Sequence, residues 1–530
     1  MGQATVTRFF SALSMTLKPA LPDPLPDVAY SAEGTRAIDR AAIDQHGIPA
    51  LTLMQRAAAG CFGALRRTWP GAKRVAILCG TGNNGGDGFV IAELARRAGL
   101  EPRVCVVGEV TRIVGTARLA FDAMRDAGVG LSSLGESLVH AEVIVDALFG
   151  TGLSRPLTGP AATAVEAINR HAAPVLAVDL PSGLHADHGT VDGHVVQASL
   201  TCTFIALKTG LLTSRGPALV GRLEFYGLDV PPAAFEAAAP ETQRIDADIV
   251  APRLPARPRD AHKGSFGHLL LVGGDRPYAG AILLATRAAL RTGAGLVSAG
   301  THPEHAVALA SAAPEAMFSA VRTPADLERL AERASSIAVG PGLGTAKWGR
   351  EALSAVLALD KPTVIDADAL NVLATSPSGL PTPSTLIVTP HPGEAARLLD
   401  TTVAAVQSDR LQAAQRIARA LDAVCILKGA GTVIAHPRAR SSIATVGNPG
   451  LAAGGSGDVL TGVAGALLAQ GPSLALTAFA AAELAVCVHG AAADYAAAGG
   501  ERGMTASDVI DALRIVVNPV RGGPVSPLEA

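Results

Sequence analysis

The residues best suited to chemistry lie in a glycine-rich segment near the C-terminus, Asn448-Pro-Gly-Leu-Ala-Ala-Gly-Gly-Ser-Gly-Asp458. A strand-like run, 442–446, precedes this segment, and a run of small apolar residues, 459–469, follows it. This order predicts a tight turn that opens a helix, where the first free N–H groups face an anion. Asp458 would then face the reacting group while the backbone amides face a phosphate. A glycine-rich connector with an N-terminal aspartate is the simpler alternative.

Two further strand ends in the C-terminal half carry groups typical of phosphoryl transfer. Lys428 follows the apolar run 424–427 and stands before two glycines, and His391 lies between two prolines after the run 386–388. A histidine in such a loop would, alone, be an ordinary loop residue. Together with the glycine-rich turn, however, these groups favour a site in which positioning and charge stabilisation supply most of the catalysis. The residues alone predict a small-molecule kinase-like domain.

In the N-terminal half, three polar loops follow apolar runs of strand length, at 83–87, 146–153 and 179–183. An aspartate after a strand is usually a cap or a turn residue. Three such loops indicate a site, because ligands of parallel α/β sheets bind outside the carboxyl ends of the strands. Residues 80–85 also satisfy the dinucleotide pattern G-x-G-x-x-G. Their Asn83, Asn84 and the nearby Asp87 suit a cation better than a pyrophosphate.

The elements that must position these loops alternate between buried strands and helices, which predicts parallel α/β sheets. At 530 residues the chain exceeds what one hydrophobic core usually serves. We expect a helix over 32–65, a strand over 74–79 and a helix over 89–98 that follows the first loop. The predicted organisation is an N-terminal extension (1–28), a Rossmann-like parallel α/β sandwich (29–235), a linker (236–252), a second α/β domain (253–520) and a C-terminal tail (521–530).

Composition excludes several classes of protein. The net charge is -2 and aromatic residues make up 3% of the chain, so nothing indicates a nucleic-acid partner. The six cysteines are scattered without a C-x-x-C pair, which favours a reduced, cytoplasmic protein over a disulfide framework or a zinc site. The most apolar stretch, 474–488, contains Glu483 and is too short to span a bilayer, so we expect a buried helix and no membrane partner.

The loops of the N-terminal half resemble the signature loops of the NAD(P)H-hydrate epimerase family, over roughly Ala29 to Asp229. The matching segments are Gly82-Asn-Asn-Gly-Gly-Asp-Gly88, Asp146-Ala-Leu-Phe-Gly-Thr-Gly-Leu153 and Asp179-Leu-Pro-Ser-Gly183. The resemblance implies a potassium ion held by Asn84, Asp146 and Ser182. It also implies that hydrated NAD(P)H is bound by Asn83, Asn84, Gly85, Gly86, Asp87, Gly150, Thr151, Gly152, Leu153, Ser154, Arg155, Pro156 and Asp179. Thr81, where relatives often have Pro or Lys, changes only the turn.

The C-terminal half resembles the nucleotide-dependent NAD(P)H-hydrate dehydratase family, whose fold is ribokinase-like, over about Asp248 to Val517. The matching segments are Lys263-Gly-Ser-Phe-Gly267, Gly340-Pro-Gly-Leu-Gly344, Thr389-Pro-His-Pro-Gly-Glu394, Lys428-Gly-Ala-Gly-Thr432 and Asn448 to Asp458. The resemblance implies nucleotide binding by Lys428, Gly429, Ala430, Gly431, Thr432 and Gly457. It implies binding of the hydrated substrate by Ala281, Gly344, His391 and Asp458.

Both halves on one chain resemble the bifunctional bacterial enzyme. That resemblance implies the hydrated dinucleotides NADHX and NADPHX as substrates, ADP with magnesium as the phosphoryl donor, and a homo-oligomer. Asp179 is the expected acid and base of the epimerase and Asp458 the expected base of the dehydratase. One rival is a dehydrogenase fused to a vitamin-type kinase, for which Glu109 would be a loose ribose-binding candidate. The other is a silent nucleotide-binding scaffold, against which Asp179, Lys428 and Asp458 argue.

Overall fold

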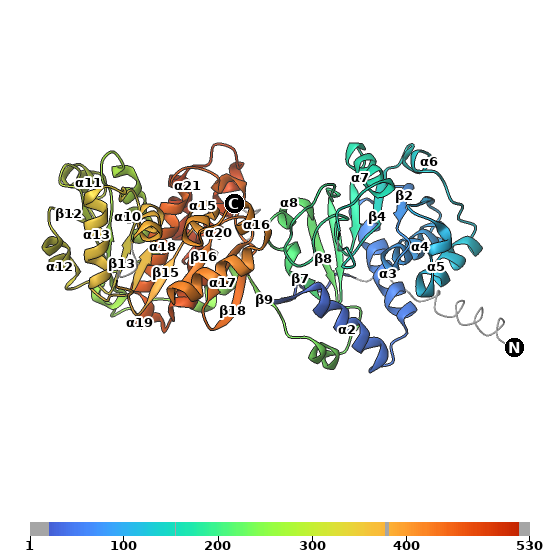
Figure 1. Cartoon of the computed structure of the whole chain (residues 1–530), viewed down its shortest axis with the longest axis horizontal. Helices are drawn as coiled ribbons and strands as arrows, with labels where there is room; N and C mark the ends of the chain where they lie inside the picture. Colours follow the sequence, from blue (N-terminus) through green and yellow to red (C-terminus); the bar gives the residue numbers. More distant parts are fainter. Residues whose placement is uncertain (1–20, 154, 377–380, 519–530) are drawn as a thin grey trace. The chain divides into compact units, whose positions relative to one another are not determined.

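The computed structural model describes residues 21–153, 155–376 and 381–518. The chain divides into two compact units, Met1–Thr242 and Gln243–Ala530 (Figure 1). Each unit is an α/β domain with its own sheet and its own buried core, as the alternation of strands and helices predicted. Among the described residues, no helix combines the length and the apolar character that crossing a bilayer requires.

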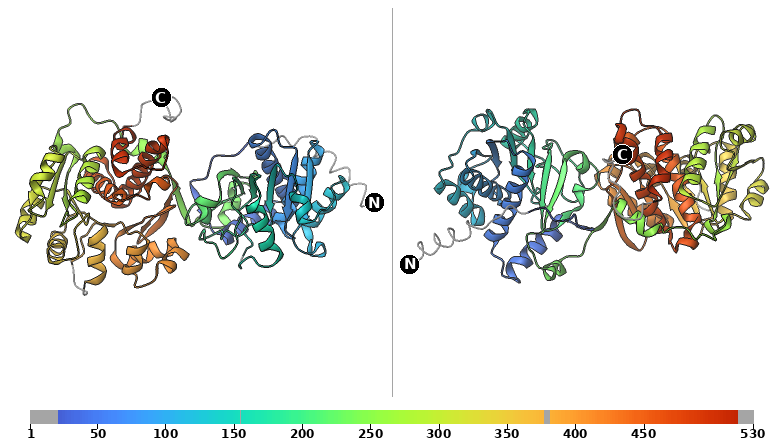
Figure 2. Two further views of the ribbon diagram at one scale, coloured as in Figure 1. Left: turned by 90° about the horizontal axis from the view of Figure 1, so that it is seen from above. Right: turned by 180° about the vertical axis from the view of Figure 1, so that it is seen from behind.

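The sheet of the first unit has six strands, all parallel, in the order β3-β2-β4-β5-β6-β8. Side chains of β2 alternate between two cores: Val75 and Ile77 pack on the side of α3, α4 and α5, and Ala76 and Leu78 pack on the side of α6 and α7. The ribbon of this unit shows the helices that flank the sheet (Figures 1 and 2). Helices therefore cover both faces, as expected for a parallel sheet. The bounds are β2 Arg74–Cys79, β3 Glu101–Val106, β4 Val143–Ala147, β5 Val175–Val178, β6 Leu200–Phe204, β8 Arg222–Tyr226, α3 Ala50–Thr68, α4 Asn83–Arg97, α5 Gly115–Asp126, α6 Leu134–Leu138 and α7 Pro160–Arg170.

Two predicted helices of this unit differ from the structure. The helix expected over 32–65 is two helices, α2 (Ala32–Asp44) and α3. The break falls where Gly47 adopts a left-handed φ of 68° and Pro49, which has no N–H to donate, precedes α3. The helix expected over 89–98 starts earlier, because α4 already begins at Asn83. The segment 83–87, predicted as a loop, thus forms the first turns of a helix.

Both ends of the first unit contain folded segments, although an extension (1–28) and a linker (236–252) were predicted there. Residues 1–20 lie outside the described part, but Asp23 accepts a hydrogen bond from Gly227 N–H at 2.8 Å. Strand β1 (Val28–Tyr30) then pairs in parallel with β7 (Leu207–Lys208). The predicted linker, 236–252, is folded along most of its length and includes β9 (Thr242–Ile245). Ile245 and Val250 are buried in the core of the second unit, which accounts for this order.

In the second unit the strands lie in the order β12-β11-β10-β13-β14-β15-β16-β17-β18. Pairing is parallel from β12 to β16, and β17 and β18 are antiparallel additions. The bounds of the strands are β10 His268–Val272, β11 Leu296–Thr301, β12 Met317–Ala320, β13 Ser336–Val339, β14 Thr363–Ile365, β15 Leu386–Val388, β16 Val424–Leu427, β17 Thr432–His436 and β18 Ala439–Ala444. The carboxyl ends of β13 to β16 consequently lie along one edge of the sheet.

The main core of this unit lies between the sheet and four helices, α10 (Ala279–Thr292), α18 (Ser456–Ala469), α20 (Ala478–Ala496) and α21 (Ala506–Val516). Helix α20 is the buried helix predicted from the apolar stretch, and its Glu483 accepts hydrogen bonds from Ser442 Oγ at 2.6 Å and from Arg253 at 2.8 Å. The other helices are α11 Ala306–Ala312, α12 Pro324–Ala331, α13 Lys347–Ala358, α14 Ala367–Thr375, α15 Pro392–Leu398, α16 Val403–Ser408, α17 Arg410–Leu421 and α19 Gly471–Leu474. The predicted tail, 521–530, lies outside the described residues.

Candidate active sites

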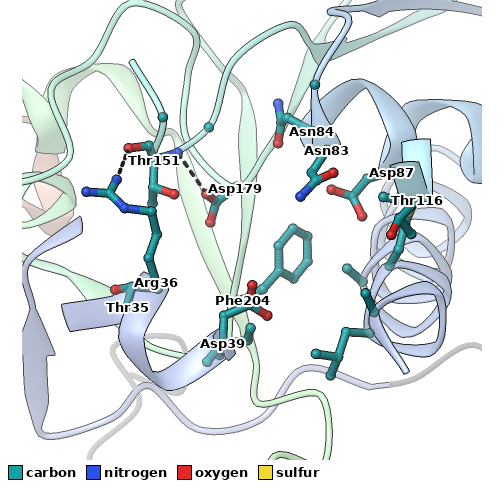
Figure 3. Close-up of a pocket in the computed structure, with 18 of the residues that line it drawn as sticks. Thr35, Arg36, Asp39, Asn83, Asn84, Asp87, Thr116, Thr151, Asp179 and Phe204 are labelled. Atoms are coloured by element: carbon teal, nitrogen blue, oxygen red, sulfur yellow. Dashed lines mark hydrogen bonds between the residues drawn. The ribbon is translucent and has the colours of Figure 1, made fainter. Parts of the chain in front are cut away.

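A cavity of about 540 Å³ opens at the carboxyl ends of the strands of the first unit (Figure 3). Seven of the predicted site residues line it: Asn83, Asn84, Asp87, Gly150, Thr151, Gly152 and Asp179. Helix α2 closes another side with Arg36 and Asp39, and Phe204 at the end of β6 supplies an aromatic wall. The cavity thus has an apolar wall and an acidic rim. Loops far apart in the sequence meet here because parallel strands end at one edge of the sheet.

Asp179 lies directly after β5 with a left-handed φ of 70°, which is unusual for a residue other than glycine. Both oxygens of its carboxylate are held. Oδ1 accepts a hydrogen bond from Lys208 Nζ at 2.5 Å and one from Thr203 Oγ1 at 3.3 Å, and Oδ2 accepts one from Thr151 N–H at 3.3 Å. The backbone conformation and these contacts together hold the carboxylate toward the cavity (Figure 3).

Lys208 is a site residue that was not predicted from the sequence. Its side chain is 1% exposed, and it forms the buried ion pair with Asp179. It ends the short strand β7, next to an apolar run, so nothing in the sequence distinguished it from a surface lysine. Thr35, Asp39 and Phe204, which also line the cavity, were not predicted either.

Close packing explains the glycines of the Asn83–Asp87 segment. A Cβ on Gly85 would lie 1.9 Å from the Gly80 carbonyl oxygen, and one on Gly86 would lie 2.5 Å from the Met54 methyl group. Neither glycine lines the cavity; they let α4 pack tightly so that its first turn presents Asn83, Asn84 and Asp87. Burial, and next the negative charge of Asp179, raise the pKa of Asp87 well above its ordinary value.

Two of the predicted potassium ligands, Asp146 and Ser182, are in contact beside the cavity, and the third, Asn84, lines it. The Asp146 carboxylate is fully buried and accepts hydrogen bonds from Ser182 N–H at 2.8 Å and Leu148 N–H at 3.2 Å. Ser182 Oγ lies 2.7 Å from Asp146 Oδ1 and 3.2 Å from the Phe149 carbonyl oxygen. Burial raises the pKa of Asp146 to about 6, although these hydrogen bonds lower it. Asn84 Nδ2 is buried without a hydrogen-bond partner among the described residues.

The remaining predicted positions of this site lie apart from the cavity. Leu153 packs partly into the core beside α7, and Arg155 and Pro156 are exposed. Ser154 lies outside the described residues. Arg36 Nη1 donates to the Thr151 carbonyl at 2.8 Å and so ties helix α2 to the loop that carries Gly150 to Gly152 (Figure 3).

The second unit gathers a charged cluster at the ends of β14, β15 and β16. Lys428 Nζ donates to Asp366 Oδ1 at 2.7 Å and lies 3.8 Å from Glu394 Oε2. Thr461 of α18 donates to Asp366 Oδ2 at 2.6 Å. Although burial opposes protonation, the charge of Asp366 raises the pKa of Lys428. The lysine is thus a fixed cation whose position Asp366 sets. Asp366 directly follows an apolar run in the sequence but was not predicted as a site residue.

Asp458 lies in the first turn of α18, whose N-cap Gly455 has a left-handed φ of 93°. Burial, and next the negative charge of Asp366, raise the pKa of Asp458 to about 7, against the opposing effect of Lys428. A Cβ on the neighbouring Gly457 would lie 3.5 Å from Lys428 Nζ, which shows how close this turn lies to the lysine. A carboxylate with this pKa accepts and returns a proton readily near neutral pH.

The other predicted positions of the second site lie around these charges. His391 is the N-cap of α15, where its Nδ1 accepts from Gly393 N–H at 2.9 Å, and burial followed by the charge of Lys428 lowers its pKa. Gly344 N–H donates to Asp368 Oδ2 at 2.9 Å. The negative charge of Asp368 is close enough to Asp458 to contribute to its raised pKa. Ala281 lies in the first turn of α10.

The Lys428–Thr432 segment has an unusual support. Gly429 and Gly431 both have left-handed φ angles, 141° and 62°, and Thr432 begins β17. The Arg410 guanidinium, which is almost fully buried, donates to the carbonyls of Leu427 at 3.1 Å and Lys428 at 3.2 Å. Arg410 therefore fixes the start of this turn, and Ala430 within it is exposed.

These two sites define a two-domain α/β enzyme with a separate site in each unit. A family model described as NAD(P)H-hydrate dehydratase matches residues 269–514, and one described as YjeF-related protein N-terminus matches residues 50–210. The bifunctional NAD(P)H-hydrate repair enzyme Nnr of Coxiella burnetii is 43% identical, over 93% of this chain and 100% of that protein. Its Escherichia coli counterpart of the same name is 42% identical, over 94% and 95%. The chain belongs to the family of bifunctional NAD(P)H-hydrate repair enzymes.

Solved structures match one unit at a time. The ADP/ATP-dependent NAD(P)H-hydrate dehydratase from Bacillus subtilis, co-crystallised with ATP/Mg2+, is 32% identical, with 52% of this chain and 98% of that chain covered and a TM-score of 0.47. A yeast protein, ynu0 (YNL200c), is 22% identical, with 40% and 94% covered and a TM-score of 0.36.

Proposed function

We propose that the first unit interconverts the R and S forms of hydrated NAD(P)H and that the second dehydrates the S form at the expense of ADP. The observation that carries this proposal is a lysine beside each reactive aspartate. Asp179 lies with Lys208 at one sheet edge, and Asp458 lies beside Lys428 and Asp366 at the other. The membership of the whole chain in one bifunctional family supports the assignment of both activities.

Epimerisation at C6 needs no redox change. The lone pair of the ring nitrogen N1 forms the N1=C6 bond as the C6–O bond breaks, and the departing hydroxyl takes a proton and leaves as water. Water then adds to C6 from the other face, and the electron pair of the N1=C6 bond returns to N1. A carboxylate takes the extra proton of the added water. Asp179, held at the cavity by Lys208 and Thr151, is positioned for one of these transfers. The apolar wall with Phe204 suits the planar ring.

A monovalent cation fits the Asp146 pocket. Asp146 is a fully buried carboxylate whose hydrogen bonds, among the described residues, come only from neutral donors. Burying a carboxylate is costly unless a positive charge accompanies it. We therefore propose that Asp146, Ser182 and Asn84 hold potassium. The ion would supply positive charge at the wall of the cavity.

Asp146→Ala should abolish most of the epimerase activity and leave ADP-dependent dehydration of pure S hydrate nearly intact, because the two sites belong to separate units. Transfer of the wild-type protein into potassium-free buffer should lower epimerisation in the same way, and added potassium should restore it only in the wild type. Both rates are followed by chromatography of the epimers and by reduced-nicotinamide absorbance. Equal loss of both activities in a folded variant would contradict the separation of the sites.

The C6 hydroxyl that the second unit must remove is a poor leaving group. We propose that Asp458 takes the proton of the C6 hydroxyl while that oxygen attacks the terminal phosphorus of ADP, supplied as its magnesium complex, and AMP departs. The N1 lone pair then expels phosphate, and loss of a proton from C5 gives NAD(P)H. The amides at the start of α18 and the Lys428 ammonium face the transferring phosphoryl group. Lys428 to Thr432 would hold the rest of the nucleotide.

The test of both activities is an incubation of the purified protein with mixed R and S hydrates. With ADP present, reduced nicotinamide should appear until the whole pool is consumed. Without ADP, the epimers should equilibrate and no reduced nicotinamide should form. A protein that reduces or oxidises a nicotinamide substrate instead would favour the dehydrogenase alternative.

A further inference from the structure

Three carboxylates and one buried ammonium group share the cavity of the first unit. Asp179 comes from the end of β5, Asp87 from α4 and Asp39 from α2, and Lys208 lies beneath them at the end of β7. Figure 3 shows Asp39, Asp87 and Asp179 around the same space, with the Phe204 ring between them. An epimerase that serves both faces of a flat ring needs a proton carrier on each face. The question is which carboxylates carry these protons.

Lys208 cannot be one of the carriers, because its hydrogen-bonding capacity is used up. Its three Nζ hydrogens match three acceptors, Asp179 Oδ1 at 2.5 Å, the Phe204 carbonyl at 2.9 Å and Thr203 Oγ1 at 3.0 Å. Its side chain is 1% exposed. Lys208 is therefore a positioning residue that fixes Oδ1 of Asp179 from behind the cavity.

Asp39 has the opposite surroundings. Its carboxylate lines the cavity and makes no hydrogen bond or ion pair with another described residue. Burial raises its pKa, and the charge of Asp179 adds to this, against Lys208 and Arg40. Asp179 is held by three donors, whereas no donor holds Asp39 among the described residues. Two carboxylates whose environments differ in this way are the pattern of an acid and its partner base. The pKa of Asp87, the third carboxylate, is also raised by burial, so Asp87 is the competing candidate for the acid.

We propose that Asp39 is the second catalytic residue of the first unit; this rests on the proposed epimerase activity. Asp39 protonates the departing C6 hydroxyl on one face of the ring. Asp179, which is bound to Lys208, takes the proton of the incoming water on the other face. Asp39 gives one proton, the C6–O bond breaks and water leaves. The new water forms a C6–O bond on the opposite face and gives one proton to Asp179. After a forward turnover Asp39 regains a proton from bulk water and Asp179 releases one to it, and the reverse reaction has the same effect, so atoms and charges balance.

The experiment follows the C6 oxygen in water enriched in oxygen-18, with the full-length protein, separate R and S hydrates of NADH, and no ADP. Asp39→Asn and Asp179→Asn should each lower epimerisation by about 10²-fold or more. Asp179→Asn should still exchange the oxygen of one epimer, because Asp39 can expel and readmit water on its own face. Asp39→Asn combined with Asp179→Asn should lose that exchange. Persistence of the exchange in the double variant would overturn the proposal, and so would wild-type epimerisation in Asp39→Asn.

Lys208→Met tests the positioning role through separate kcat and KM values. Loss of the ammonium group removes the shortest hydrogen bond to Asp179 Oδ1, so the carboxylate should lose its fixed position. The kcat of epimerisation should then fall by up to about 10²-fold while KM for the hydrate stays nearly unchanged. An unchanged kcat would overturn the positioning role, and so would a change in KM alone.

Matched controls keep these outcomes apart. Asp44→Asn changes an exposed aspartate on the same helix as Asp39, and Lys73→Met removes an exposed lysine; both should leave epimerisation unchanged. ADP-dependent dehydration of S hydrate by the second unit reports that each variant is folded. Asp87 is the competing candidate for the acid. If Asp87→Asn, and not Asp39→Asn, removes the oxygen exchange that Asp179→Asn retains, the acid is Asp87. A wild-type protein that does not epimerise at all would refute the proposed function, not the choice of Asp39.

Discussion

Asp458→Asn should lower kcat for ADP-dependent dehydration by on the order of 10²-fold or more, the scale of a lost general base. The amide cannot take the proton of the C6 hydroxyl, and the neighbouring carboxylate of Asp366 is a poor replacement, since it is bound to Lys428 and Thr461. Nucleotide affinity should stay the same or rise, because the substitution removes a negative charge from the phosphate site. Steady-state rates with pure S hydrate and a nucleotide-binding titration measure the two effects.

The pH profile gives an independent check of this prediction. The pKa of Asp458 is raised to about 7, and a base acts only when ionised, so dehydration should fall as the pH drops through about 7. This limb should be absent from the residual activity of Asp458→Asn. Asp511→Asn, an exposed aspartate in α21, is the control and should match the wild type. Unimpaired turnover by Asp458→Asn would remove Asp458 from the mechanism.

Two disabled full-length chains should complement each other when mixed. Asp179→Asn with ADP should consume the S hydrate and stall when only the R form is left, apart from slow spontaneous epimerisation. Asp458→Asn should equilibrate the epimers and produce almost no reduced nicotinamide. The mixture should convert the whole pool, because the intermediate is a free small molecule and each site is complete within its own unit.

The amount of unconverted hydrate decides this second prediction. The remaining R hydrate should be close to its share of the starting mixture with Asp179→Asn alone, and close to zero in the mixture of variants. Wild-type protein at the same concentration of each active site sets the reference rate. If the mixture stalls as Asp179→Asn does while the wild type runs to completion, the two sites must be coupled within one chain.

Periodicity and short motifs in the sequence predicted most of the framework. An apolar run of strand length located β2 to the residue, the strand-end rule located Asp179 and Lys428, and the glycine-rich turn located Asp458 at the start of a helix. Both sites lie at carboxyl ends of parallel strands, as this rule requires. The start of α4 was missed because Asn83 and the glycines after it are poor helix formers, and close packing of Gly85 overrides that preference.

The partners that fix each reactive group could not be predicted from the sequence. Lys208 and Asp366 lie far along the chain from Asp179 and Lys428, and only the folded sheet brings each pair within hydrogen-bond distance. Asp39 lies on the polar side of an amphipathic helix, so the sequence pattern predicts a surface residue. Burial decides the role of all three, and burial depends on tertiary packing that local sequence does not determine.

The left-handed conformation of Asp179 has a consequence for the history of this family. A backbone of this kind costs about 1 to 3 kcal/mol for a residue other than glycine, and a buried lysine without its partner costs about 3 to 5 kcal/mol. Neither Asp179 nor Lys208 can therefore drift alone. A lineage that no longer used this activity would gain stability by replacing both, with glycine at position 179 and an apolar residue at position 208. Relatives should keep or lose the two together, and joint loss would mark chains in which only the second domain still works.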